Sequence, residues 1–394
     1  MKCYLCHSNK ATLFLDLGKQ PLANKYPQSE KEFKKEDFFP LKVFFCTECK
    51  NVQLGTVVSR KRMFEDYYYL SSVNLGLVRH FEQLATKLKK AKFVVDVGSN
   101  DGILLKPLKA LDVKAIGVDP SINVGKIAND AGLETIVSFF DQAAAKKILI
   151  EYGKPDVIVA SSIFTHLEDP HECVKAVDIL MSEEGEFIVE VEYIGNILKN
   201  IQFERFYLDR IFYYSLTSLH HLFAQYGMYI KDIEEIEPHG GSMRVIVKRQ
   251  WAGGKPSSRA TRLLTEEKRT LTLAKLNAFK KRVDNAVTAL RTKLEKYKKA
   301  KIKVAGYGAP ARVATITNYG KIGPALIPFI VDDSPLKQNR FSPGKHIPIT
   351  TQSYLDTHQP DVLVVFAYEY FKDIKKKTKG AYRYLLPIPP KEVS

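Results

Sequence analysis

Two pairs of cysteines constrain the first part of the chain more than any other feature. Four of the five cysteines fall in two Cys-x-x-Cys pairs, which are Cys3 with Cys6 and Cys46 with Cys49. Each pair brings two sulfurs to one side of a tight turn, so the two pairs supply four thiolates, a ligand set typical of tetrahedral structural Zn²⁺. A redox Cys-x-x-Cys site would not predict a second pair. The sequence therefore predicts a small module closed by zinc, with His7 as a bystander.

A site closed by four thiolates has no open position for substrate, so we expect its zinc to stabilise the fold and not to activate water. We also expect a cytoplasmic protein that makes no membrane contact. The N-terminus lacks the apolar region of a secretory signal, and no apolar run approaches the roughly 18 residues that a spanning helix needs.

The fifth cysteine, Cys173, falls in a helical pattern with Val174 and Val177, which indicates a small buried residue and not a nucleophile.

Beyond the cysteines, short β-branched runs alternate with helical stretches, as in a parallel α/β sheet. The length of 394 residues suggests two or three domains. The boundaries that we predict are a zinc-binding module at 1–75, a core at 76–250, a connecting helix at 251–300 and a second Rossmann-like unit at 301–394. The connecting helix is predicted from apolar residues at three- and four-residue intervals: Leu276, Phe279, Val283, Val287, Leu290, Leu294 and Tyr297.

The first glycine-rich loop follows a predicted strand at 93–97 and opens a helix. It runs from Asp96 to Gly102, and Asp119 ends the next strand, where a carboxylate can bind ribose hydroxyls. A dinucleotide loop needs a glycine where this chain has Asn100, and the carboxylate of Asp101 would repel a pyrophosphate. S-adenosylmethionine carries a sulfonium and an ammonium and no phosphate. The loop therefore favours a class I methyltransferase with a Rossmann-like core over a dehydrogenase.

With these motifs in place, the chain resembles the three-domain sugar C-methyltransferases that act on nucleotide-linked 4-keto-deoxysugars. The resemblance runs nearly end to end. It rests on an ordered set of motifs, none decisive alone: Asp-Leu-Gly-Lys-Gln-Pro-Leu-Ala-Asn at 16–24, Asp-Tyr-Tyr-Tyr-Leu-Ser-Ser at 66–72, Gly-Ser-Asn-Asp-Gly at 98–102, Phe-Thr-His-Leu-Glu-Asp at 164–169, His-Gly-Gly-Ser-Met-Arg at 239–244, Gly-Tyr-Gly-Ala-Pro-Ala at 306–311, and the stretches 332–338 and 343–349.

The resemblance implies three groups of site residues beside the cysteines. The cofactor residues would be Asp96, Gly98, Asn100, Asp101, Gly102, Asp119 and Ser161. The substrate residues would be Tyr67, Ser162, His239, Ser242, Arg244, Tyr307, Arg312 and Lys337. The catalytic residues would come from Tyr69, His166, Tyr207, Asp209 and Arg210. For any one basic residue of the C-terminal unit, a solvated surface position is the simpler interpretation.

One departure from the family falls where the sugar ring would lie. The family has Tyr-His-Glu-His where this chain has Tyr207-Leu208-Asp209-Arg210, and Ser162 replaces an asparagine. The second histidine of that family segment is taken to be the base that forms an enolate. Arginine stays protonated, so Arg210 can only stabilise an enolate or carboxylate oxygen.

The alternatives for the base are His166, Asp209 and one of the tyrosines Tyr67, Tyr69 and Tyr207. His166 is the first choice, with a structural histidine as an equally good interpretation. If no side chain abstracts the proton, the scaffold would methylate an oxygen or a nitrogen.

The second glycine-rich turn, Gly306-x-Gly308-x-x-Ala311, fits the dinucleotide fingerprint better than the first and would by itself suggest NAD. The resemblance implies instead a domain that helps to enclose the nucleotide sugar.

The net charge of +16 calls for an anionic partner, which a nucleotide diphosphate would satisfy. A nucleic-acid methyltransferase is the rival class, but its Asn/Asp-Pro-Pro-Tyr motif is absent where the chain reads Ser161-Ser162-Ile163-Phe164. A binding module without enzyme activity is the third class.

Overall fold

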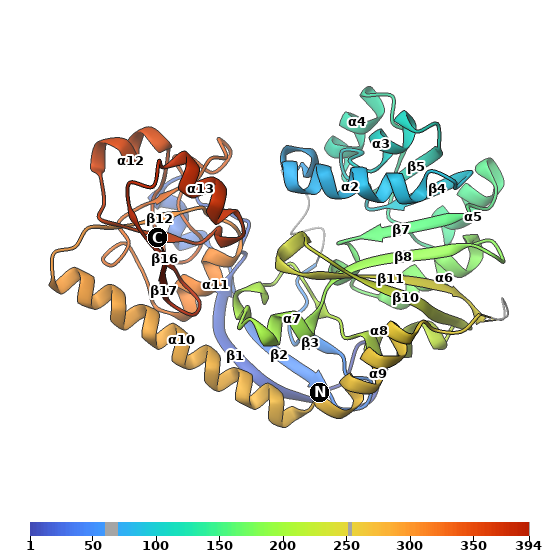
Figure 1. The fold of residues 1–394 in the computed structure, drawn as a ribbon, viewed down its shortest axis with the longest axis horizontal. Helices are drawn as coiled ribbons and strands as arrows, with labels where there is room; N and C mark the ends of the chain where they lie inside the picture. The colour runs from blue at the N-terminus through green and yellow to red at the C-terminus, as the bar shows by residue number, and fades with distance from the viewer. Residues whose placement is uncertain (60–69, 251–253, 394) are drawn as a thin grey trace.

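The computed structural model describes residues 1–59, 70–250 and 254–393, together with the backbone but not the side chain of His239. The ribbon shows two lobes, with the strands of the zinc-binding module lying between and below them (Figure 1). Three sheets of four, seven and six strands organise the described part of the chain. Within it, no helix is both long and apolar enough to cross a lipid bilayer.

The zinc-binding module forms the four-stranded sheet, whose order is β1-β2-β3-β9. Its strands are β1 (Ala11–Pro21), β2 (Phe38–Cys46), β3 (Val52–Leu54) and β9 (Phe212–Tyr213). The last strand comes from a much later part of the chain and pairs antiparallel with β3. The module is therefore not an independent unit, because its sheet is completed by a segment that follows the predicted catalytic residues.

The first lobe contains the seven-stranded sheet, whose order is β10-β11-β8-β7-β4-β5-β6. Its strands are β4 (Phe93–Val97), β5 (Lys114–Asp119), β6 (Thr135–Val137), β7 (Val157–Ser161), β8 (Glu186–Glu192), β10 (Met228–Ile236) and β11 (Ser242–Arg249). Strands β4 to β8 pair in parallel, while β10 and β11 pair antiparallel. This confirms the predicted Rossmann-like core.

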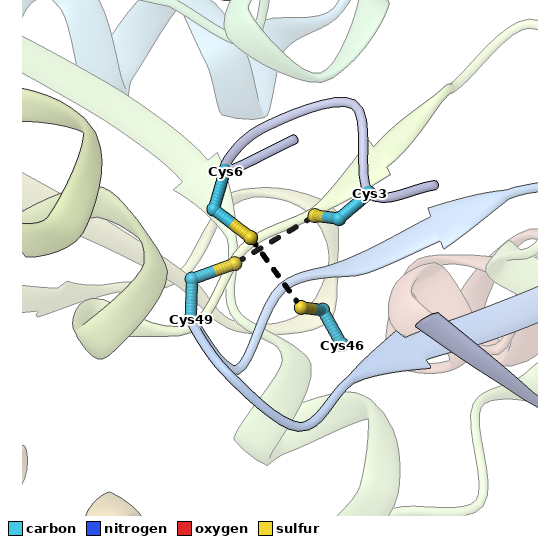
Figure 2. A group of neighbouring side chains, drawn as sticks. All are labelled: Cys3, Cys6, Cys46 and Cys49. Carbon is cyan, nitrogen blue, oxygen red and sulfur yellow. Dashed lines mark hydrogen bonds between the residues drawn. The ribbon is translucent and has the colours of Figure 1, made fainter. Parts of the chain in front are cut away.

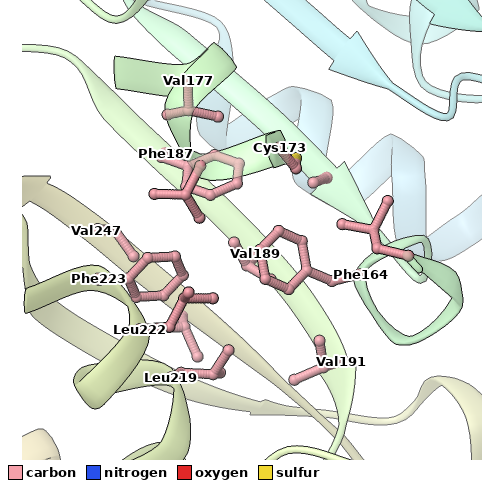
Figure 3. Close-up of a cluster of buried hydrophobic side chains, with 14 of the residues drawn as sticks. Phe164, Cys173, Val177, Phe187, Val189, Val191, Leu219, Leu222, Phe223 and Val247 are labelled. Carbon is pink, nitrogen blue, oxygen red and sulfur yellow. The ribbon is translucent and has the colours of Figure 1, made fainter. Parts of the chain in front are cut away.

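Helices cover both faces of this sheet, which is why its strands read as nearly continuous apolar runs. One face packs against α2 (Leu75–Leu88) and α3 (Leu105–Ala110). The other packs against α5 (Gln142–Tyr152), α6 (Pro170–Leu180) and α8 (Leu216–Ala224). Figure 3 shows this second layer, in which Phe164, Phe187 and Phe223 lie between the sheet and the helices.

The second lobe is the C-terminal unit, whose six-stranded sheet has the order β14-β13-β12-β15-β16-β17. Its elements are β12 (Val304–Tyr307), α11 (Arg312–Tyr319), β13 (Ile330–Val331), β14 (Ile349–Thr350), α12 (Gln352–His358), β15 (Val362–Val365), α13 (Phe371–Lys377), β16 (Arg383–Leu386) and β17 (Lys391–Val393). Five of these strands, β12 to β16, pair in parallel, and β17 pairs antiparallel with β16. The second Rossmann-like unit is therefore also present.

Two helices connect the lobes where one was expected, α9 (Ser258–Thr270) and α10 (Leu273–Lys299). The break occurs because the hydroxyl of Thr272 accepts a hydrogen bond from the backbone of Lys275 and starts a new helix. The predicted apolar stripe is confirmed, since all of its members are buried in α10. Figure 1 shows α10 along the base of the C-terminal unit.

Candidate active site and zinc site

The four predicted zinc ligands converge on one point (Figure 2). Their sulfur atoms lie within 4.8 Å of one another, with 3.7 Å between Cys3 and Cys49 and 3.5 Å between Cys6 and Cys46. A tetrahedron with Zn–S bonds of about 2.3 Å has sulfur–sulfur edges of about 3.8 Å. The donor set and its geometry therefore fit a structural Zn²⁺. His7 lies outside this cluster and stacks on His171 instead.

The first cysteine turn is joined to helix α6 of the core. The His171 ring donates from Nε2 to the backbone oxygen of Leu5 at 2.7 Å, and its Nδ1 accepts from the hydroxyl of Tyr226 at 2.8 Å. Two residues later on the same helix, Cys173 is only 2% exposed, as predicted for a small buried side chain. The zinc site thus supports the helix that packs beneath the cofactor loop.

The first glycine-rich turn has the backbone shape that its sequence predicts. Gly98 and Gly102 have φ angles of +76° and +82°, and Asn100 lies in the same left-handed region at +50°. The carboxylate of Asp119 accepts hydrogen bonds from the backbone of Asn100 at 3.0 Å and of Ser121 at 2.9 Å. These bonds hold the turn against the end of β5.

This turn offers both a charge and an apolar wall to a ligand. Among the described residues, Oδ1 of Asp101 is buried without a hydrogen-bond donor, while Oδ2 accepts from the backbone of Ser72 at 3.2 Å. A small cavity beside Gly98 is lined by Val97, Gly98, Val118, Pro120, Phe139, Phe140, Ile163, Leu167 and Cys173. A buried carboxylate oxygen next to an apolar cavity fits the cationic, phosphate-free S-adenosylmethionine.

A layer of charged side chains lies under the turn, inside the sheet. Burial, with Asp119 and Glu190 nearby, raises the pKa of Asp96 to about 8. Burial would also raise the pKa of Glu190, but hydrogen bonds and charges from His80, Arg244 and Ser161 lower it to about 2. Of these, His80 Nε2 lies 2.9 Å from Glu190 and Arg244 Nε lies 2.7 Å from it. The structure thus places the predicted substrate residue Arg244 in this buried layer.

The predicted catalytic residues His166, Tyr207, Asp209 and Arg210 are brought together. His166 Nδ1 donates to the backbone oxygen of Asp209 at 2.5 Å. The Asp209 carboxylate accepts from the amide of Asn24 at 2.6 Å. Burial raises the pKa of Asp209, against the opposing effects of Asn24 and Arg210. Tyr67 and Tyr69 lie outside the described residues.

Arg210 is fixed as a buried cation. Its guanidinium pairs with Glu192 and lies 4.9 Å from the centre of the Tyr207 ring. Burial alone would lower the pKa of Arg210, but the carboxylate of Glu192 keeps it above its usual range. Arg210 therefore cannot accept a proton from a substrate, as the sequence predicts.

An ionic cluster continues from Arg210 into the C-terminal unit. Glu192 also pairs with Arg205 at 3.0 Å, and Arg205 pairs with Glu369 of the second lobe. Arg312, a predicted substrate residue, pairs with the same Glu369. Gly240 packs closely here, because a Cβ added to it would lie 2.5 Å from Arg205 Nη2. Gly240 of the 239–244 motif thus packs at the junction between the lobes.

The remaining predicted residues lie in separate groups of contacts. Ser162 has a φ angle of +61° beside the cofactor turn, and Ser242 donates to the backbone oxygen of Pro238 at 2.9 Å. In the C-terminal unit, the Tyr307 hydroxyl lies 3.3 Å from Asp333, and Lys337 lies 3.7 Å from Asp332.

Several residues of this site were missed by the reasoning from sequence. They are Asn24, His80, Glu190, Glu192, Arg205 and Glu369. Only Asn24 had a signal, because it ends the stretch 16–24 on which the resemblance partly rests. The others are single charged residues or a single histidine, and nothing in their local sequence separates a buried position from a solvated one.

Comparison with known proteins gives a consistent assignment. Three family models match in succession: "Putative zinc binding domain" over residues 3–64, "Methyltransferase domain" over 69–232 and "C-methyltransferase C-terminal domain" over 237–389. The C-methyltransferase NovU of Streptomyces niveus is 29% identical over 406 aligned residues, which cover 100% of this chain and 96% of the relative.

Two further matches are confined to part of the chain. The ubiquinone biosynthesis O-methyltransferase of Cupriavidus pinatubonensis is 28% identical over 32% of this chain and 49% of its own length. The crystal structure of a SAM-dependent methyltransferase from Archaeoglobus fulgidus aligns with 48% of this chain and 97% of its own, with 14% identity and a TM-score of 0.38.

The fold, the cofactor turn and the cysteine cluster agree with the matched domain models. The relative that aligns over the whole chain is named as a C-methyltransferase. The chain is an S-adenosylmethionine-dependent methyltransferase whose sequence matches, in order, a putative zinc binding domain, a methyltransferase domain and a C-methyltransferase C-terminal domain.

Proposed function

We propose that this enzyme methylates a carbon next to the ketone of a nucleotide-linked deoxysugar. The family resemblance and the name of the full-length relative support C-methylation. The basic net charge of +16 suits a substrate that carries a diphosphate. Because a four-thiolate site needs a reducing compartment, we also propose that the reaction takes place in the cytoplasm.

The observation that carries the proposal is the hydrogen bond between His166 and Asp209. A backbone carbonyl can only accept, so Nδ1 of His166 bears the hydrogen at a separation of 2.5 Å. The neutral form of this ring would carry its lone pair on Nε2, which is the form that a general base needs. His166 also lies between Ile163 and Leu167, both of which line the cavity beside the cofactor turn.

Arg210 supplies the complementary charge in this proposal. In the described structure, its Nε atom is buried without a hydrogen-bond acceptor, while Nη1 pairs with the Glu192 carboxylate. N–H groups fixed in a dry site stabilise a negatively charged oxygen that develops during a reaction. We therefore assign proton abstraction to His166 and stabilisation of the enolate oxygen to Arg210. S-adenosylmethionine, when bound, supplies the electrophilic methyl group.

The remaining site residues are predictions that this proposal includes. The substrate contacts are Tyr67, Ser162, His239, Ser242, Arg244, Tyr307, Arg312 and Lys337, and the further catalytic candidates are Tyr69 and Tyr207. Methylation of an oxygen or nitrogen is the second candidate, and the observation that favours it is the ion-paired Arg210 at the position of the family base.

The test uses the purified enzyme with 4-keto-deoxysugars linked to thymidine, uridine, cytidine or guanosine diphosphate in deuterated water. We expect deuterium to enter beside the ketone without cofactor, and a carbon-bound methyl group to form when S-adenosylmethionine is added. His166→Ala should abolish both reactions, whereas His358→Ala, an exposed histidine of the C-terminal unit, should not. A methyl group found on oxygen or nitrogen, or full exchange by His166→Ala, would refute the proposal.

A further inference from the structure

The loop that follows β1 carries one side chain from the zinc-binding module into the catalytic group. The Asn24 amide donates to the Asp209 carboxylate at 2.6 Å, across 185 residues of sequence. Asp209 is 7% exposed, so its carboxylate depends on hydrogen bonds that protein groups supply. Asn24 itself is exposed, so the backbone of its loop positions the amide, and packing in the core does not.

The module also fixes the backbone on the other side of Asp209. The backbone N–H of Leu54 donates to the oxygen of Ile211 at 2.9 Å, and β9 pairs with β3 directly after it. The N–H of Ile211 donates to the oxygen of Thr165 at 2.9 Å, next to His166. Asn24 thus fixes the side chain of Asp209, and the zinc-binding sheet fixes the backbone that follows it.

The orientation of Asp209 decides what His166 can do. The backbone oxygen of Asp209 accepts from Nδ1 of His166, and this contact sets the tautomer of the ring. The groups that face Asp209 are the amide of Asn24 and the side chains of Tyr26, Tyr207 and Arg210. The Asn24 amide donates a hydrogen bond to its carboxylate from another part of the chain, and the backbone N–H of Asp209 itself donates a second.

We infer that Asn24 is a positioning residue of the active site, which orients His166 through Asp209. The inference rests on the proposed role of His166 as the base. It gives the zinc-binding module a task beyond stability, because the module supplies a side chain to the catalytic group. Two residues after Asn24, the Tyr26 hydroxyl donates to the backbone oxygen of Ala309 at 2.8 Å, so the same loop also reaches the C-terminal unit.

The test compares four variants of the full-length zinc-loaded protein. Asn24→Ala removes the donor, and Asn24→Asp places a carboxylate against Asp209. The double variant Asn24→Asp with Asp209→Asn restores one donor and one acceptor in reversed order. Gln28→Ala is the matched control, since Gln28 is an exposed amide of the same loop. Nitrogen-15 NMR of the His166 ring, with S-adenosylhomocysteine present, reports the tautomer directly.

We expect the Nδ1–H tautomer in the wild type and in Gln28→Ala, and its loss in Asn24→Ala and Asn24→Asp. The rate of deuterium exchange into the keto sugar should fall about tenfold in Asn24→Ala and further in Asn24→Asp, as is typical when a group that orients a reactive histidine is removed. KM and the affinity for S-adenosylhomocysteine should stay within twofold, and the double variant should recover most of the exchange rate.

An unchanged His166 tautomer in Asn24→Asp would overturn the inference, and so would equal losses in Gln28→Ala or no recovery in the double variant. The tautomer is measured without substrate. If the wild-type enzyme does not act on any keto sugar, the proposed substrate is wrong, but the NMR result still decides whether Asn24 orients His166.

Discussion

The two glycine-rich turns of this protein are built alike and yet differ in what surrounds them. In the core, Asp119 accepts from the backbone of Asn100 at 3.0 Å and of Ser121 at 2.9 Å. In the C-terminal unit, Asp332 accepts from the backbone of Ala309 at 2.6 Å and of Ser334 at 2.9 Å. Both are acidic residues at the end of the second strand that tie a glycine turn to the sheet.

The packing against the two turns is different. A Cβ added to Gly98 would lie 2.7 Å from the end of the Ile163 side chain, beside a cavity. A Cβ added to Gly308 would lie 2.4 Å from the Cβ of Ala367 and 3.1 Å from its backbone nitrogen, which cannot move aside as easily. Backbone thus packs closely against the second turn, which has the better dinucleotide fingerprint. Glycine spacing predicts a turn, whereas the neighbouring segment determines the room for a ligand.

Removal of zinc should have the largest effect on the stability of the protein, and the loss of stability should be concentrated in the first lobe. Three of the cysteines share a hydrophobic cluster with Val97 and Cys173 of the core. Structural zinc contributes on the order of 10 kcal/mol to the folding of small zinc domains. We expect Cys46→Ser to increase hydrogen exchange in β3, β9 and α6 far more than in β12 and β15, as measured by mass spectrometry.

Cys173→Ala is the control for that experiment, because it removes a buried cysteine outside the zinc cluster. It should keep one zinc per chain and the wild-type exchange pattern in β3 and β9. Equal loss of protection in both lobes of Cys46→Ser would contradict the packing of the zinc site against the first lobe.

The two acidic residues allow a matched comparison of the turns. Asp119→Asn should weaken binding of S-adenosylhomocysteine roughly 10- to 100-fold, since a hydrogen bond to a charged group contributes about 1.5–3 kcal/mol. Asp332→Asn removes the same charge from the same kind of turn, and we expect it to change the affinity less than twofold. Isothermal titration calorimetry measures both. Equal effects would show that the two turns do not differ in function.

The charged layer under the first turn predicts the smallest effect, a dependence of affinity on pH. The second turn has no such layer in β12 or β15, because neither strand contains a charged residue. Because burial and two nearby carboxylates raise the pKa of Asp96 to about 8, its carboxyl group is neutral at pH 7 and becomes charged as the pH rises. An anionic Asp96 attracts a cationic ligand, so S-adenosylmethionine should bind a few-fold more tightly at pH 9 than at pH 7.

Asp96→Asn separates this effect from titration of the ligand itself. The variant should lose the increase in affinity between pH 7 and pH 9, while Asp332→Asn should keep it. A wild-type affinity that falls over this range would contradict the assigned direction.

Much of the fold followed from local sequence. The strand predicted at 93–97 is β4, because a buried parallel strand reads as a short apolar run. The break between α9 and α10 was not predicted, since the apolar stripe continues toward it and only the hydroxyl of Thr272 marks the new start. The addition of β9 to the zinc-binding sheet was also missed, because a two-residue strand has no periodicity to detect.

The sequence by itself determined the zinc ligands, the Rossmann-like core and the cofactor turn, because each depends on residues that are close in sequence and have a specific spacing. Only the tertiary structure decided that Arg210 pairs with Glu192, that Asn24 reaches Asp209, and that Ala367 packs against Gly308. These contacts join distant segments, and a charged or amide side chain has the same local sequence whether it is solvated or paired. Its role is therefore set by the partner that folding brings to it.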